Sequence, residues 1–553
     1  VEDLRRLFRQ ANDPPIAAWR CRRTVHRRPS PCTGTKRTAQ IVSSRRDPSA
    51  CLVATTRFCT PWAGPTGTQI RPPVRSCSTT AVGIPENTPV EEFFADCDVV
   101  VTGRFMNQRV APCPLEVRGS AAAWVDGRLH QWVSTQHAQD IKGPIVAANG
   151  VDPDVVHIIT PDVGGAFGAK IGTYPEEMLL GPIARDLGRP VTWRETRSES
   201  MMGLGHGRAQ LQYVTIGGSR DGRVTHLQEH VIQDSGAFAD VGTILPVAFG
   251  RPMTSAVYDI ANIEMRVTSV VTNTTPTVPY RGAGRPEATA AAERAMDMFA
   301  AEVGLDPAEV RRINLIAKFS DGHTTSIGQT YDVGDFEGAL DRALEAAGYT
   351  ELRAEQARRR AAGDAKLLGI GVSVYVEITG GAGDMIEAGK IEVLDDGSAL
   401  VYTGTSPHGQ GHDTAWSMIT TEQTGIPMDR ITLIWGDTDL VPSGGGTMAS
   451  RSLQQGGAAV NQAAVELVDR ARELAARVLE ADVADIVLDT DTGSFHVAGT
   501  PAVSTSWADL AVASRADGDD LTVATRFTAS QATFPFGAHV AVVEVDVDTG
   551  QVR

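Results

Sequence analysis

Cysteine is scarce in this sequence and unevenly placed, with seven residues in all and none after Cys113. No two cysteines have the CxxC spacing, which argues against a zinc or iron–sulfur framework. The sequence also lacks a run of about 18 to 20 apolar residues, so no membrane span is expected. The first residues are too charged for a secretory signal. These absences favour a cytoplasmic protein.

Positive charge is also in short supply, since 51 basic residues face 67 acidic ones and the net charge is −16. Binding to nucleic acid needs clustered Lys and Arg, so a nucleic-acid partner is not expected. An apolar fraction of 42% in 553 residues is ordinary for a globular enzyme and sufficient for several cores.

Residues 1–78 differ from the rest of the chain. They contain fifteen basic and four acidic residues, and the remainder contains 36 basic and 63 acidic ones. This stretch shows neither a helical nor a strand period. We interpret it as a segment read in a wrong frame, with the correct frame resuming near Val82. Disorder and a nucleic-acid-binding tail are the alternatives.

From Val82 onward, helix and strand patterns alternate. Strands with period-two alternation are expected at 97–109 and in a hairpin over 115–136 that turns at Asp126–Gly127. The helix expected at 286–303 is marked by proline near its first turn and glycine after its end. Helices are expected within 143–149, 286–303, 307–314, 331–366 and 456–482, and a second hairpin over 390–405 with its turn at Asp396–Gly397. The pattern predicts an α+β fold.

The end of the sequence resembles an unfinished hairpin. Residues 539–547 alternate as a strand and 548–550 form a turn, after which only three residues remain. An unpaired strand edge is unfavourable, so we expect the chain to be truncated at Arg553.

Five short segments stand out by their content of glycine and polar residues. They are STQ (Ser134–Gln136), PDVGGAFGAK (Pro161–Lys170), TVPYRGAGRPE (Thr277–Glu287), PHGQGHDT (Pro407–Thr414) and GGGTMASRS (Gly444–Ser452). Alone, each has a simpler interpretation as a turn. The glycine segment at Lys170 is not a phosphate-binding P-loop, because Ala169 precedes the lysine and Ile171 follows it. HGQGH lacks the Glu of the HExxH zinc motif.

Taken together, and in this order, the five segments resemble the molybdenum-cofactor subunit of the xanthine dehydrogenase and aldehyde oxidase family. The resemblance implies two catalytic residues, Gln136 beside the apical oxygen of molybdenum and Arg281 positioning cofactor or substrate. It also implies that the pterin dinucleotide, expected in its cytosine form, is bound by Gly165, Phe167, Gly168, Arg281, Gly282, Gly409, Gln410, Thr447, Ala449, Ser450 and Ser452. No side chain is expected to ligate the metal.

The loop around Gly282 bears on the subfamily. Aerobic carbon monoxide dehydrogenases carry a copper-binding cysteine in this loop, and glycine cannot replace a thiolate ligand. The loop is similar instead to the AYRGAGR form of the carbon monoxide dehydrogenase-like proteins, so no copper is expected. Purine hydroxylases have a Glu directly after the lysine of the glycine loop. Ile171 stands there in this sequence, which argues against a purine substrate.

The resemblance further implies two mixed α/β-sheet domains with the cofactor at their interface. We expect an aberrant or disordered remnant of a small domain at 1–80, cofactor domains at 81–330 and 367–553, and a helical linker at 331–366. The expected partners are a 2Fe-2S small subunit and an FAD-binding medium subunit, assembled as a dimer of heterotrimers. The implied reaction is the hydroxylation of a small aldehyde or N-heterocycle by water. The electrons that it releases would leave through these partner subunits.

The proton-accepting Glu of the family lies in a GVGE-type loop, and this sequence contains no Gly-Glu dipeptide. We therefore expect the catalytic Glu to lie beyond Arg553 and the fragment to be inactive. Two other function classes remain open. One is a pyrophosphate- or carbohydrate-binding module without redox chemistry. The other is a zinc hydrolase with His408 and His412 as ligands.

Overall fold

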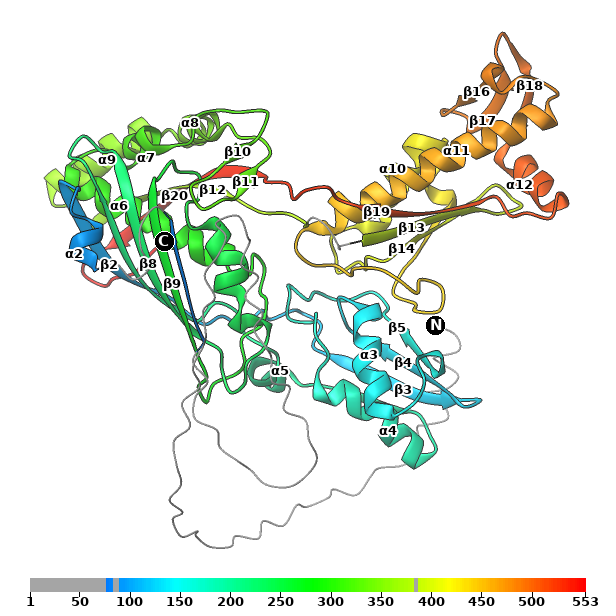
Figure 1. Ribbon diagram of the computed structural model, residues 1–553, viewed down its shortest axis with the longest axis horizontal. Coiled ribbons are helices and arrows are strands. Elements are labelled where there is room, and N and C mark those ends of the chain that lie inside the picture. The colour runs from blue at the N-terminus through cyan, green and yellow to red at the C-terminus, as the bar shows by residue number, and fades with distance from the viewer. Residues whose placement is uncertain (1–75, 83–88, 382–385) are drawn as a thin grey trace, which may run out of the picture. The chain divides into compact units, whose positions relative to one another are not determined.

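The computed structural model describes residues 76–82, 89–381 and 386–553 (Figure 1). The interpretation of residues 1–78 as out of frame falls almost wholly outside these described residues. Its last positions do not, because strand β1 (Ser76–Val82) is paired antiparallel with β9. Regular structure is therefore present a few residues before Val82.

A five-stranded sheet with the order β1-β9-β8-β7-β2 organises the first part of the chain. Its other strands are β2 (Val99–Asn107), β7 (Gln210–Gly218), β8 (Val224–Asp234) and β9 (Asn262–Val270). Helix α6 (Arg285–Val303) packs against β2 and β7. Its buried face is rich in alanine, and small side chains allow close approach to the sheet. As predicted, α6 has Pro286 in its first turn and ends at Gly304.

A smaller sheet with the order β5-β4-β3-β6 carries the first two sequence segments. The strands are β3 (Gly119–Val125), β4 (Arg128–Val133), β5 (Val156–Ile159) and β6 (Val191–Arg194), with helices α3 (Ala138–Asn149) and α4 (Pro175–Leu187) against them. The predicted hairpin turn at Asp126–Gly127 is confirmed, and both residues have positive φ. Gln136 follows the end of β4, and the glycine loop follows the end of β5.

The third sheet has the order β15-β14-β13-β19 and belongs to the second half of the chain. Its strands are β13 (Ile386–Val393), β14 (Ala399–Thr403), β15 (Ile431–Ile434) and β19 (Thr522–Thr528). The predicted long helix is α11 (Ala458–Val478), which lies along β13 and β19 (Figure 1). Helix α10 (His412–Thr424) packs beside it. A three-stranded sheet of β16 (Ile486–Asp489), β17 (Ser494–Val497) and β18 (Thr500–Ser506), with α12 (Trp507–Ala516), completes this part.

The remaining elements connect the halves. Helices α7 (Pro307–Asn314), α8 (Phe336–Ala347) and α9 (Tyr349–Ala362) occupy the predicted helical positions. The other short elements are α2 (Val90–Phe93), α5 (Arg197–Gly203), β10 (His323–Thr324) and β11 (Thr330–Tyr331). Strand β12 (Lys366–Val376) then pairs antiparallel over its whole length with β20 (Phe536–Asp546). One edge of β20 therefore has a partner, and after the turn Val552 forms a bridge with Val545.

The β12–β20 pair belongs to the core of the first half rather than the second. Val372, Val374 and Phe534 pack in the same apolar cluster as α6 and the five-stranded sheet. The backbone N–H of Val374 donates to the buried Glu293 carboxylate on α6 at 3.0 Å. A separate core fills the space between α11 and its sheet. The chain thus leaves the first core after β12 and returns to it at β20.

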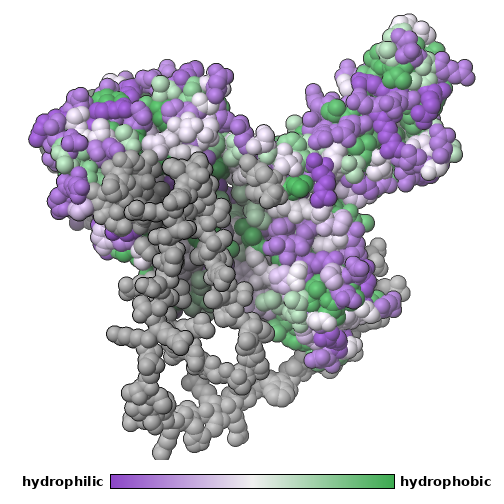
Figure 2. Space-filling view, in the orientation of Figure 1, coloured by the Kyte–Doolittle hydropathy of each residue, from purple (hydrophilic) through white to green (hydrophobic). Residues whose placement is uncertain are grey.

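In the part of the surface that Figure 2 shows in colour, hydrophilic residues predominate and apolar ones are scattered among them. Exposed apolar side chains occur mostly singly along helices and strands. Among the described residues, no helix has both the length and the apolar content to cross a membrane.

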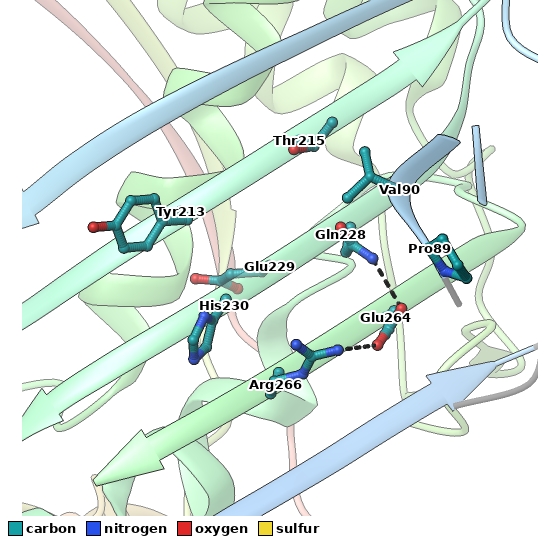
Figure 3. A pocket seen from close by; sticks show the side chains of 9 residues that line it. All are labelled: Pro89, Val90, Tyr213, Thr215, Gln228, Glu229, His230, Glu264 and Arg266. Carbon is teal, nitrogen blue, oxygen red and sulfur yellow. Dashed lines mark hydrogen bonds and ion pairs between the residues drawn. The ribbon is translucent and has the colours of Figure 1, made fainter. Parts of the chain in front are cut away.

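A cavity of about 450 Å³ lies beside strands β7, β8 and β9. Figure 3 shows Glu264 between Gln228 and Arg266, with which it interacts at 3.0 and 3.3 Å. Glu229 lines the same cavity, is 3% exposed, and has a buried carboxylate oxygen without a hydrogen-bond partner among the described residues. Burial raises the pKa of Glu229 to about 8 from an ordinary value of 4.5. The side chain is therefore protonated at neutral pH.

The Glu229 carboxyl should make stability fall as pH rises. Between pH 4.5 and 8 the folded state retains a proton that the unfolded state has lost, so the free energy of unfolding decreases across this window. Glu229→Gln removes the titration, and we expect it to stabilise the protein by roughly 4 kcal/mol more at pH 9 than at pH 5. Denaturant unfolding at both pH values measures this, with exposed Glu302→Gln on α6 as control. Equal effects at both pH values would contradict the prediction.

Candidate functional site

One cavity of about 680 Å³ gathers eleven of the twelve site residues predicted from the sequence. These residues are Gln136, Phe167, Gly168, Arg281, Gly282, Gly409, Gln410, Thr447, Ala449, Ser450 and Ser452. They come from five loops spread over more than 300 positions of the chain. The twelfth, Gly165, does not line the cavity. A Cβ added there would meet the Phe167 ring at 3.2 Å, so Gly165 lies behind that ring.

The loop after β5 reaches the cavity through Phe167 and Gly168. Both have positive φ, +55° and +103°, which turns the chain sharply back. A Cβ at Gly168 would lie 2.6 Å from the carbonyl oxygen of Pro279, so only glycine permits this packing. The backbone N–H of Arg281 donates to the Phe167 carbonyl at 2.8 Å, and the Arg281 guanidinium lies over the Phe167 ring. The two loops therefore form one unit.

Backbone strain is concentrated at this cavity. Ten described residues other than glycine have positive φ, and four of them line it: Phe167, Ala283, Ala449 and Ser450. Such conformations cost about 1–2 kcal/mol each for residues with a Cβ, and they persist where the surroundings impose them. This concentration is typical of a functional site.

The Gln136 amide joins loops from the two halves of the chain. Its Oε1 accepts hydrogen bonds from the backbone N–H groups of Gly168 at 2.9 Å and Lys170 at 3.4 Å. Its Nε2 donates to the Thr447 carbonyl at 2.7 Å, and the Thr447 N–H donates back to the Gln136 carbonyl at 3.0 Å. An amide nitrogen carries two hydrogens, so one remains for a group in the cavity.

The HGQGH segment forms the approach to helix α10. At Gly409, with φ of +96°, an added Cβ would meet no heavy atom within 4 Å, so this turn faces open space. Gln410 contacts His412 through its amide nitrogen at 3.0 Å. Burial lowers the pKa of both His408 and His412 to about 4, and both imidazoles are neutral at pH 7. The Nδ1 atom of His412 is buried without a partner among the described residues.

Contacts with neighbouring segments hold the Thr447–Ser452 segment in place. The Thr447 hydroxyl donates to the Ser406 carbonyl at 2.7 Å, and the Gly380 N–H donates to the Ala449 carbonyl at 2.8 Å. Arg451 points away from the cavity into a buried ion pair with Glu387 at 3.2 Å. A short π-helix, Ser452–Gly457, then leads into α11, and such insertions are common at functional sites.

Two charged residues of the cavity were not anticipated as site residues. Arg285 opens helix α6, and Glu377 follows β12; the Arg285 Nε lies 3.3 Å from the Glu377 carboxylate. Burial raises the pKa of Glu377, and Arg285 partly offsets this shift. Arg285 belongs to the PYRGAGR segment, so the sequence contained a signal for it. Glu377 follows an alternating strand, and the residues around it in the sequence indicate no role for it.

The zinc interpretation of HGQGH gains no support from the described residues, because no group of three or more His, Cys, Asp or Glu side chains is arranged to hold a metal ion there. His412 instead stacks on Trp416, and His408 contacts the Thr135 carbonyl at 3.3 Å.

Comparison with known proteins agrees with this geometry. Two models described as molybdopterin cofactor-binding domains match residues 77–315 and 342–553. The chain belongs to the large subunits of the molybdenum hydroxylase family, the xanthine dehydrogenase and aldehyde oxidase family. The resemblance inferred from the five segments is therefore confirmed.

Several family members are similar over most of this chain. It is 33% identical to the carbon monoxide dehydrogenase large chain of Hydrogenophaga pseudoflava, over 85% of this chain and 61% of that one. It is 32% identical to the nicotine 6-hydroxylase large subunit of Paenarthrobacter nicotinovorans, over 84% and 59%. Quinoline 2-oxidoreductase from Pseudomonas putida 86 has the same fold, with a TM-score of 0.79 at 30% identity over 86% and 62%. The chain spans about 60% of the length of these relatives.

The cavity suits the molybdenum cofactor of this family. A molybdopterin cofactor carries phosphate, which requires close backbone approach and positive charge. The turn at Gly409 is open, and α10 begins directly after Gly411 with its N-terminus near the same loop. Arg281 supplies a cation.

The packing of Gly168 against Pro279 should be sensitive to a single methyl group. We expect Gly168→Ala to destabilise the protein by about 1–3 kcal/mol, because it combines a positive φ with a clash against backbone. Gly172→Ala in the same loop is a matched control, since a Cβ there meets nothing within 4 Å. Denaturant unfolding of both variants compares them. If the two variants were equally stable, the contact between Gly168 and Pro279 would not constrain the loop.

Proposed function

We propose that the protein containing this chain is a molybdenum-dependent oxidoreductase that hydroxylates a small aldehyde or N-heterocycle, with water as the source of oxygen. The observation that carries the proposal is the convergence of Gln136, Arg281 and the three cofactor loops on one cavity. Relatives named for oxidation of carbon monoxide, nicotine and aldehydes support the reaction class.

The residues of the cavity have separate roles in this proposal. When bound, the molybdenum cofactor would supply the metal that activates the oxygen of water and accepts the electrons. Gln136 offers its remaining amide hydrogen at the end of the cavity formed by Phe167 and Gly168. Arg281, fixed over the Phe167 ring, presents its guanidinium to the cofactor or the substrate. The loops at Gln410 and Ser450 hold the dinucleotide, which we assign as the cytosine form.

The partners follow from the chemistry. Electrons must leave the site, and we propose that they pass to a 2Fe-2S small subunit and an FAD-binding medium subunit in a dimer of heterotrimers. Names such as "large chain" and "large subunit" among the relatives support a multi-subunit complex. No Gly-Glu dipeptide occurs in the 553 residues, so we assign the proton acceptor to sequence outside them and expect this chain alone to be inactive.

We also propose that the site holds no copper. A cysteine would be needed at Gly282, whose φ is +93° and where an added Cβ would lie 2.3 Å from Pro286 at the start of α6. A thiolate ligand therefore cannot be introduced here without moving the helix start.

Replacing Gly282 with cysteine should not produce a copper-dependent enzyme. In the native complex we expect Gly282→Cys to show no carbon monoxide oxidation after copper loading and to lose stability, by about 1–3 kcal/mol. Carbon monoxide-dependent dye reduction, measured with copper content, checks this. Carbon monoxide oxidation by the unmodified complex would refute the absence of copper.

Metal and nucleotide analysis tests the proposed function directly. The native complex should contain about one molybdenum per chain and release CMP on acid hydrolysis. Gln410→Ala should lower both together, because the side chain braces the turn that faces the dinucleotide. Gln462→Ala, on the exposed face of α11, is the control. A native protein free of molybdenum would instead favour a pyrophosphate- or carbohydrate-binding module.

A further inference from the structure

Glu377 is the only carboxylate among the described residues that line the cofactor cavity. Its backbone is fixed, because its N–H donates to the Pro535 carbonyl at 2.8 Å. Its side chain is 27% exposed, which leaves the carboxylate accessible from the cavity. An acidic group on a wall otherwise made of cations, glycines and neutral side chains needs an explanation.

The hydrogen-bonding capacity of this carboxylate is unused. An ionised carboxylate accepts about four hydrogen bonds, yet no described residue donates one to Glu377. Arg285 approaches at 3.3 Å through Nε, but its two terminal nitrogens donate to the carbonyls of Gly282 at 3.0 Å and Ile378 at 3.1 Å. The arginine thus holds Glu377 in position by charge and leaves its acceptor sites open.

The phosphate groups of the cofactor are not a suitable partner for Glu377. Phosphate groups are anionic and would be repelled by a carboxylate at close range. Glu377 therefore marks a part of the cavity that does not receive the pyrophosphate. Other residues of the lining, including Ile171, Pro279 and Leu453, are apolar. Together they suit a compact apolar molecule that carries one strong hydrogen-bond donor.

We propose that Glu377 is a substrate-positioning residue that accepts a hydrogen bond from an N–H group, neutral or protonated, on a flat apolar ring. This inference rests on the proposed function and narrows it, because an aldehyde without a donor cannot use the contact. A hydrogen bond to a charged acceptor is about twice as strong as a neutral one, so the contact discriminates well.

The test uses the native molybdenum complex and two probes of similar shape. Benzamidinium presents N–H donors on a flat ring, and acetophenone presents none. Their Kd values are measured by calorimetry for wild type, Glu377→Gln, Glu377→Asp and the exposed control Glu473→Gln on α11. Molybdenum content is measured on the same samples.

We expect the Kd of benzamidinium to rise at least tenfold in Glu377→Gln and less in Glu377→Asp, with acetophenone changed less than twofold and molybdenum unchanged. The Glu473→Gln control should match wild type. Three results would overturn the inference: absent or unaltered benzamidinium binding, an equal loss for both probes, or loss of molybdenum from Glu377→Gln. Absence of molybdenum from the wild type would refute the proposed function instead, which separates the two failures.

Discussion

The amide of Gln136 is the interaction on which the candidate site depends. It accepts from the glycine loop and donates to Thr447, which lies 311 positions after Gln136, so a single planar group fixes the separation of these loops. A hydrogen bond of this kind contributes about 1 kcal/mol, which is small beside the two cores. The Gln136 amide matters for geometry, because the walls of the cavity are defined only when the glycine loop and the Thr447 loop are both held in place.

The chemistry of the walls is divided in a way that suits a two-part ligand. The Arg281 side chain, the open glycine turns and a helix N-terminus suit an anion, while burial keeps His408 and His412 neutral, so these imidazoles add no charge. Glu377 and the apolar residues of the lining suit an apolar molecule that carries a hydrogen-bond donor. Selectivity between cofactor and substrate therefore follows from where each sign of charge is placed.

Local patterns predicted much of this molecule. Helix α6 and its caps, the Asp126–Gly127 hairpin turn and the α11 amphipathic pattern all depend on residues close in sequence, and all are confirmed. The loop residues were found through their resemblance to a family rather than through periodicity. Glu377 was missed because its role depends on a cavity assembled from distant loops. The pairing of β12 with β20 was missed for the same reason, since local alternation does not identify a strand's partner.

That pairing has a consequence for the order in which the protein can fold during synthesis. Val374 and Phe534 share a core with α6, but about 160 residues separate them in the chain. The ribosome must therefore release the whole second core before the first can be closed. Until then, the apolar surface of β12 has no strand beside it and is open to wrong partners. The α11 core, whose contacts lie within one continuous segment, can form earlier and shorten the loop that β20 must close.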